Sequence, residues 1–367
     1  MSYARARLWV GISGVGIVVV LSVLALRFGW ANSLLPTTTS SPGRDVLALA
    51  AVLLAHAAIL APFDLLGGYV LPRRFGRSGV SLRTFLGGWL RGISVQLGIV
   101  LLSAVVVLSA GRVGGLFGAA AAFAVVMVLL VICQWAIASL MANLVETDRQ
   151  ADVSFIRSGD PGFTGGVVGV PGRERFLVPR QWLEVLQVEG VAVELARWNA
   201  MLTARGRILG LSVAFGWNLV GFLVAAQLPA AGVDTVAGLV TLALGFTLWS
   251  FLGLLLLPSL SRPAVHVADR LARESVRPVV LERTLRRLDR QQDDEPERAA
   301  TIETIFHPIP SVARRVESLY ADDGPRFGAW HAARTALFLS WAGLGMLSRA
   351  VHCNSGRPEL WALLPCD

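Results

Sequence analysis

The sequence has no lysine, so all 33 of its basic residues are arginine, against 25 acidic residues. It has three cysteines and no C-x-x-C pair, which argues against cysteine-rich zinc modules and disulfide-dense scaffolds. It also contains no Walker sequence, no glycine-rich dinucleotide motif and no G-x-S-x-G sequence. These absences disfavour nucleotide-dependent enzymes and serine hydrolases of the types that carry such motifs.

Charged residues are scarce as well, at 16% of the chain, against about 25% in a soluble domain. Hydrophobic residues make up 54%. Apolar windows near the roughly 20 residues that a bilayer crossing needs occur at 8–30, 46–71, 85–109, 115–142, 208–228, 234–257 and 332–350. The sequence therefore predicts a polytopic α-helical membrane protein with about seven spans, the first of them an uncleaved helix.

The arginines predict how the chain is oriented, because positively charged loops remain on the inner side of a membrane. Arg5 and Arg7 precede the first span, and the loop at 72–84 and both long polar stretches are arginine-rich. We expect the N-terminus inside and the C-terminus outside, in a bacterial cytoplasmic membrane. Arginines beside spans usually set topology, so membrane lipid is an expected partner and nucleic acid is not.

Polar stretches divide the chain into six expected segments. The membrane parts are a four-span region at 1–143, a transmembrane hairpin at 207–257 and a last span at 332–350. The two halves of a small cytoplasmic α+β domain lie at 144–206 and 258–331. An extracytoplasmic tail at 351–367 follows, in which Cys353 and Cys366 are a candidate disulfide if the tail reaches an oxidising compartment.

Local patterns add detail to the two halves of the α+β domain. Residues 162–179 predict a β-hairpin about a turn at Pro171 and Gly172. The segment Glu189–Thr203 predicts a helix, and residues 263–290 predict another. The charged run QQDDEPER that follows is expected to be a solvated loop, and FHPIPSVARRVESL a turn with a short helix.

Four segments, together with the position of two spans, carry a family resemblance. FLVPRQWLEVL precedes GVAVELARWNA, two spans follow directly, and then come VHVADRLA and FHPIPSVARRVESL. In this order they resemble the lead strand, the A-H-E-L-x-H helix, the E-x-x-A-D-x-x-A helix and the H-P-x-x-x-x-R-x-x-x-L motif of HtpX-like membrane zinc peptidases. That class includes the CAAX prenyl endopeptidases. The resemblance covers roughly residues 160–320 and implies a metallopeptidase-like domain.

The same resemblance implies that the metal site is degenerate. An active helix of this type carries H-E-x-x-H, whose two histidines lie on one face and ligate zinc while the glutamate polarises a bound water. Here the histidine positions hold Val193 and Arg197, and the position of the third ligand holds Val265. Glu194 remains as a relic general base. Framework residues of the motifs also remain: Ala268, Asp269, His307, Pro308 and, with shifted spacing, Arg315.

Some alternatives remain open at these residues. Glu194 and Arg197 are three residues apart on a helix, so an ion pair is an ordinary role for both. His266 and His307 with Glu194 form an alternative zinc ligand set, although His266 is expected to face about 100° away from the family's ligand position. Asp64 and Arg91 are a candidate pair between the second and third spans.

The first functional hypothesis is therefore a catalytically inactive pseudo-peptidase without a cofactor. It would bind membrane proteins, partner subunits or a second copy of itself, with a peptide added beside the strand at 174–179. The alternatives are an active membrane zinc endopeptidase with non-standard ligands and a structural subunit of a larger membrane complex.

Overall fold

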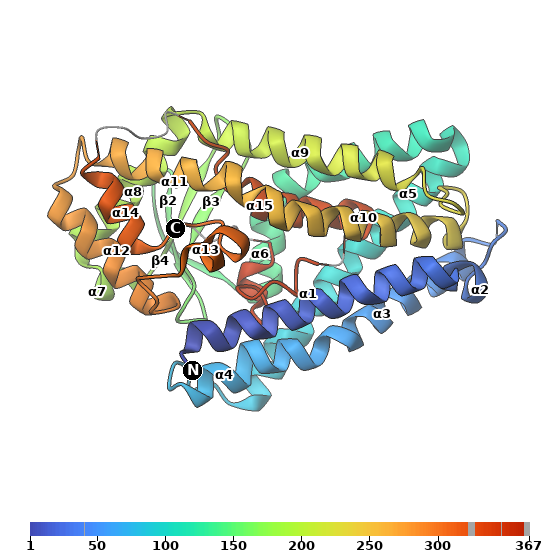
Figure 1. The fold of residues 1–367 in the computed structure, drawn as a ribbon, viewed down its shortest axis with the longest axis horizontal. Helices are drawn as coiled ribbons and strands as arrows, with labels where there is room; N and C mark the ends of the chain where they lie inside the picture. The colour runs from blue at the N-terminus through green and yellow to red at the C-terminus, as the bar shows by residue number, and fades with distance from the viewer. Residues whose placement is uncertain (40, 322–326, 346, 363–367) are drawn as a thin grey trace.

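A computed structural model describes residues 1–39, 41–321, 327–345 and 347–362. Long helices lie side by side along the long axis of the molecule, and a small sheet with short helices lies at one end (Figure 1). Mostly helical structure with a small sheet agrees with the predicted fold class. The N-terminus and the start of the first helix lie at the same end as the sheet (Figure 1).

Within the described residues, five helices are long and apolar enough to cross a membrane. They are α1 (Tyr3–Phe28), the continuous run of α3 (Pro42–Leu65), η1 (Leu66–Val70) and α4 (Leu71–Arg74), then α5 (Leu82–Ile132), α9 (Gly206–Ala225) and α10 (Val236–Leu256). Two short helices, α2 (Trp30–Leu34) and α6 (Gln134–Ala142), follow α1 and α5. The sequence windows at 85–109 and 115–142 thus both fall on α5 and α6.

Helix α5 changes direction at Gly114 and Gly115, which have non-helical backbone angles. Gly115 has φ of 56°, a left-handed conformation that costs glycine little because it has no Cβ. A Cβ on Gly118 would lie 2.4 Å from the carbonyl oxygen of Ala110, whereas eight residues of straight helix span about 12 Å. The chain therefore turns back here, and α5 consists of two legs.

The predicted seventh span at 332–350 is wrong as a continuous helix. Among its described residues, 332–345 and 347–350, helical structure is confined to α15 (Ala332–Leu339) and the 3-10 turn η2 (Ser340–Gly343). Their side chains are buried inside the protein, and Ser348 and Arg349 are 2% exposed. Burial in a protein interior selects apolar residues as a bilayer does, so composition alone did not separate the two environments.

The sheet contains four strands, β1 (Val145–Gln150), β2 (Val153–Arg157), β3 (Gly166–Val168) and β4 (Arg175–Pro179), in the order β1-β2-β4-β3. Strands β3 and β4 pair antiparallel, which confirms the hairpin predicted about Pro171 and Gly172. Strand β2 pairs parallel with β4, and β1 pairs antiparallel with β2. The sequence analysis missed β1 and β2, whose residues VETDRQ and VSFIR include several charges.

Short helices pack around the sheet: α7 (Trp182–Val185), α8 (Gln187–Thr203), α11 (Pro258–Ala272), α12 (Pro278–Gln292), α13 (Ala300–Phe306) and α14 (Val312–Leu319). The helix predicted over 263–290 is two helices, because Pro278 disfavours helical backbone at the residue before it. Helix α8 packs against β4, α11 and α12. Trp182, Trp198 and Phe176 form the centre of the core between them.

The C-terminal segment (347–362, with the 3-10 turn η3 at Pro358–Leu360) threads through the interior of the molecule (Figure 1). Glycines on the surrounding helices leave room for its backbone, since a Cβ on Gly68 would lie 2.2 Å from the carbonyl oxygen of Gly356. Asp64 accepts hydrogen bonds from Arg349, from Trp89 at 3.0 Å and from the backbone N–H of Gly356 at 2.9 Å.

Two predictions about this part of the chain need comment. Asp64 pairs with Arg349, so the predicted pair between Asp64 and Arg91 is wrong. The described tail residues are not an extension beyond the fold, since the carbonyls of His352 and Cys353 accept hydrogen bonds from Arg7 at 2.9 Å. Cys366 lies outside the described residues, so the Cys353–Cys366 disulfide stays a prediction; Cys353 itself is half-buried and not part of a described disulfide.

Candidate functional site

Helix α8 carries the residues that match the family's metal-binding helix. Its sequence is rich in good helix formers such as alanine, leucine and glutamate, and it ends before Arg205, which is left-handed at φ of 57°. Val193, Glu194 and Arg197 all face the interior, with exposed fractions of 0%, 0% and 1%. The helix thus directs into the core the positions from which a peptidase of this type would bind zinc.

Arg197 joins helix α8 to helix α11 through two carboxylates. Its Nη1 donates to Oε2 of Glu194 at 2.5 Å, and its Nε donates to Oδ1 of Asp269 at 2.7 Å. The predicted pairing of Glu194 with Arg197 is therefore present. The contact with Asp269, 72 positions away in the chain, fixes the relative placement of the two helices.

Asp269 also binds a second arginine, from helix α14. Arg315 donates from Nε to Oδ2 at 2.8 Å and from Nη2 to Oδ1 at 2.9 Å, which is a bidentate pair and a strong geometry for such contacts. Burial alone would raise the pKa of Asp269, but the guanidinium groups of Arg315 and Arg197 lower it to about 2. We name Glu194, Arg197, Asp269 and Arg315 the ion cluster.

Val193 and Val265 occupy the other two predicted ligand positions. Val193 is fully buried with Leu281, Leu285 and Val312 in an apolar cluster beside the ion cluster. Val265, on α11, is 2% exposed. Both positions have become part of the packed core, and neither side chain has an atom that binds a metal.

The residues at this position do not fit a zinc ion. Zinc needs three or four nitrogen, sulfur or oxygen ligands, and two of the three expected positions are valines. The third is an arginine whose permanent positive charge repels a cation. The carboxylate of Glu194 binds that arginine. We therefore derive no metal-dependent step at this site.

The alternative ligand set of Glu194, His266 and His307 is not brought together either. Nδ1 of His266 lies 2.8 Å from Oγ of Ser318, and burial lowers the pKa of His266. His307 lies elsewhere, with its ring 5.1 Å from that of His352. Across the described residues, no group of three histidine, cysteine, aspartate or glutamate side chains has metal-binding geometry.

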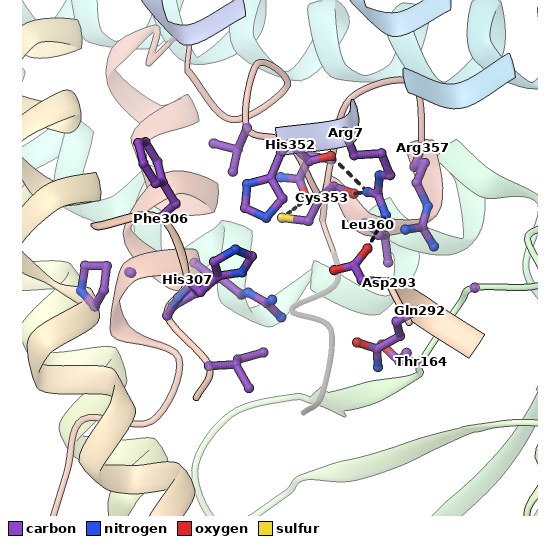
Figure 2. A pocket seen from close by; sticks show the side chains of 18 of the residues that line it. Arg7, Thr164, Gln292, Asp293, Phe306, His307, His352, Cys353, Arg357 and Leu360 are labelled. Atoms are coloured by element: carbon purple, nitrogen blue, oxygen red, sulfur yellow. Dashed lines mark hydrogen bonds and ion pairs between the residues drawn. The ribbon is translucent and has the colours of Figure 1, made fainter. Parts of the chain in front are cut away.

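His307 and His352 belong to a separate cavity of about 110 Å³, which we name the inner cavity. Figure 2 shows both histidines around it with Asp293 and Arg7. Nη1 of Arg7 donates to Oδ1 of Asp293 at 3.0 Å. Among the described residues, Nε2 of His307 is buried without a hydrogen-bond partner. This cavity therefore holds polar atoms that are available to water or a small ligand.

Both histidines of the inner cavity favour the neutral state. Burial, together with the charges of Arg7 and Arg298, lowers the pKa of His352 to about 4 against the opposing effect of Asp293. Burial and the neighbouring His352 likewise lower the pKa of His307. At neutral pH the two rings are hydrogen-bonding groups rather than cations.

Sequence reasoning missed the inner cavity. Asp293 falls in the run QQDDEPER, which was predicted to be a solvated loop, yet its side chain is only 17% exposed and paired with Arg7. Arg7 was assigned to membrane topology, but it is 2% exposed. Arg7 could have indicated this site, because an arginine at the edge of a span usually pairs with a carboxylate or with backbone carbonyls.

The predicted peptide groove beside 174–179 is contradicted by the sheet order. Strand β4 already pairs with β2 on one side and β3 on the other, so no peptide can add to it. At the β3 edge, Arg207 donates to the carbonyl oxygens of Val167 and Gly169 at 2.8 and 2.6 Å. At the β1 edge, the register shifts between Glu146 and Asp148, an irregularity that disfavours strand addition.

With this geometry established, comparisons with known proteins place the fold. No family model and no curated protein matches the chain. The chain is similar to the crystal structure of S. mikatae Ste24p, with a TM-score of 0.64 and 12% sequence identity over 76% of each chain. The two chains share a fold. At this level of identity the likeness shows the fold alone.

Proposed function

We propose that this protein is a catalytically inactive relative of the membrane zinc metallopeptidases, which acts by binding membrane proteins or partner subunits. The observation that carries the proposal is Arg197, which occupies a metal-ligand position and bridges Glu194 and Asp269 across α8 and α11. An ion pair holds together here the two helices that, in a peptidase, would meet at the metal. The fold then needs no zinc for its stability.

The state of the residual glutamate supports loss of peptidase chemistry. A general base must reach the proton that it abstracts, but Glu194 is fully buried and binds Arg197. Among the described residues, no group of three histidine, cysteine, aspartate or glutamate side chains could hold a metal in place of the missing ligands. The pseudo-peptidase hypothesis is therefore favoured over the zinc endopeptidase with non-standard ligands, because the proposed ligands of that enzyme do not come together in the described residues.

The binding part of the proposal rests on the retained fold and on the surfaces that remain open. Both edges of the sheet are protected, so strand addition is not the mode of binding. The long helices expose apolar side chains to the bilayer, and partner helices associate with such surfaces by packing. We therefore expect partners to be membrane proteins, or a second copy of this chain, held through the spans.

The register of the replaced site is tested by restoring it. The triple variant Val193→His, Arg197→His and Val265→Glu should bind one zinc ion, since it supplies two imidazoles and a carboxylate. The matched control is Val193→His with Val265→Glu, which retains Arg197 and should bind none. A folded triple variant that takes up no zinc would contradict the assignment of these three positions.

The binding role is tested separately in native membranes. Photocrosslinking groups on the outer faces of α1 and α5 should capture a membrane protein or a second copy at a constant ratio. The same adducts should form in the Glu194→Gln variant, because binding is independent of peptidase chemistry. Adducts that vanish in that variant, together with accumulation of uncut membrane proteins, would indicate an active peptidase instead.

A further inference from the structure

A second cavity, of about 400 Å³, lies where the long helices meet the polar domain. We name it the boundary cavity. Its volume is in the range of about 300–1,000 Å³ that is typical of ligand pockets. The walls come from η1, the start of α5, the end of α6, the loop before β3 and the C-terminal segment. It lies beside the inner cavity, with which it shares Gly162, Gln292 and Arg357.

Arg91 is the cation in this cavity that remains available. It is exposed, and it forms no hydrogen bond or ion pair within the described part of the chain. The other two arginines are engaged. Arg77 donates to backbone carbonyls of α12 and pairs with Asp294 at 3.6 Å, and Arg357 pairs with Asp160 at 2.6 Å.

The acidic residues of the boundary cavity, Asp160 and Glu359, neutralise little of the positive charge of Arg91. Asp160 is neutralised by its ion pair with Arg357. Burial, and then the neighbouring Asp160 carboxylate, raise the pKa of Glu359, so this carboxyl is protonated at a higher pH than an ordinary glutamate. The remaining charge in the cavity is therefore positive and lies at Arg91.

Another part of the cavity wall is apolar and comes from the start of α5. Phe85 and Trp89 line it, and aromatic residues of this kind are typical of the membrane–water boundary. Along the same helix, a stripe of leucines spaced by one turn is 44%, 37% and 55% exposed: Leu82, Leu86 and Leu90. The occupant that matches such walls has an anionic head and an apolar tail.

We propose that the boundary cavity binds the phosphate headgroup of an anionic phospholipid, with Arg91 as its counter-ion and the acyl chains along α5. Basic pockets between helices at the inner side of a membrane bind lipid headgroups in this way. Gly88 lines the cavity, and no atom lies within 4 Å of the position of a Cβ there, so the helix leaves space for the glycerol. This site does not depend on the proposed pseudo-peptidase function.

The test measures retention of phosphatidylglycerol and of phosphatidylcholine by the detergent-purified full chain, by native mass spectrometry. The wild type should retain phosphatidylglycerol preferentially. Arg91→Gln should weaken that retention about tenfold, the ratio expected from one lost charge-assisted contact, while Arg91→Lys keeps part of it. Thermal unfolding of lipid-free protein should be unchanged in both variants, because Arg91 has no described partner to lose.

The matched control is Arg44→Gln, since Arg44 is also exposed and unpaired within the described residues but lies at the start of α3, away from the cavity. It should retain phosphatidylglycerol as the wild type does. Equal loss in Arg44→Gln and Arg91→Gln, or no loss in either, would overturn the proposal. Inorganic phosphate is the third probe. If it stabilises the wild type as strongly as the lipid does, the ligand is a free phosphate and the lipid assignment is overturned.

Discussion

The ion cluster and the inner cavity are both buried sets of charged and polar residues, but they differ in whether these groups have partners. In the ion cluster, Arg197 and Arg315 meet the carboxylates of Glu194 and Asp269 at 2.5 to 2.9 Å. In the inner cavity, Nε2 of His307 has no described partner and about 110 Å³ of space remains. The charged groups of the ion cluster bind one another, whereas the inner cavity has space and a polar atom for a small ligand.

The difference shows how an arginine at a predicted metal-ligand position can act as a structural link. An arginine is large enough to fill the space between facing helices, and its fork of donors can hold carboxylates on both. His307 and His352, whose imidazoles are suited to ligate zinc, meet in the inner cavity without a third ligand in the described residues. The predicted ligand positions Val193, Arg197 and Val265 therefore carry side chains that do not bind zinc.

The largest expected effect comes from breaking the ion cluster. Arg197→Met leaves the carboxylates of Glu194 and Asp269 buried with fewer counter-charges, which costs about 3–5 kcal/mol for a buried pair. The melting temperature in detergent should fall sharply, and adding Glu194→Gln should recover part of the loss. The matched control is Arg286→Met, whose pair with Glu282 is about half exposed and contributes about 0–1 kcal/mol. Equal effects of the two single variants would contradict the account of the cluster.

A second variant loosens one wall of the inner cavity without touching the ion cluster. In Gly68→Ala the new Cβ would clash with the backbone of Gly356, and overpacking of this kind costs about 1–3 kcal/mol. We expect lower thermal stability and faster hydrogen exchange in the C-terminal segment, with α8 unaffected. Gly87→Ala is the control, because that position is open. A stable Gly68→Ala protein with unchanged exchange would show that the segment is not closely held.

The smallest expected effect is a dependence of stability on pH that originates in the inner cavity. The ordinary pKa of histidine is 6.5, and that of His352 is lowered to about 4. Between these values the unfolded state takes up a proton that the folded state excludes, so stability falls as the pH falls below 6.5. The loss at pH 5 is about 1–2 kcal/mol.

Thermal unfolding at pH 7.5 and pH 5 measures this loss, and His352→Gln should reduce the difference between the two values. Asp269 of the ion cluster makes no contribution in this range, because its lowered pKa adds stability that is lost only as the pH falls from about 4 to about 2. A pH dependence that is unchanged in His352→Gln would mean that another group is responsible.

Local patterns were enough to predict some of these features. The pair of Glu194 and Arg197 follows from their spacing of three residues on a helix, and the β3–β4 hairpin follows from its turn sequence. The contacts of Asp269 span 46 and 72 positions. No local pattern specifies such contacts, although the family motif had marked the residue. Local patterns likewise do not specify the contact between Arg7 and Asp293, which are far apart in the chain, or the inner cavity that they line.

The errors have different physical causes, and the first is that burial in protein and burial in lipid select similar residues. The window at 332–350 is apolar because α15 and η2 lie inside the protein, not because they cross a bilayer. The groove predicted at β4 was wrong because strands β1 and β2, masked by their charges, were not recognised. Because β4 pairs with β2 on one side and with β3 on the other, it is an interior strand of the sheet.

The central claim is that the old metal position holds an ion cluster and no zinc. It is tested most directly by the metal content of the detergent-purified protein, isolated with a tag that binds no metal, after mild chelation and readdition of zinc. The account predicts less than a tenth of an equivalent of zinc, on the order of adventitious binding. One tightly held equivalent that is lost on His307→Ala would contradict it.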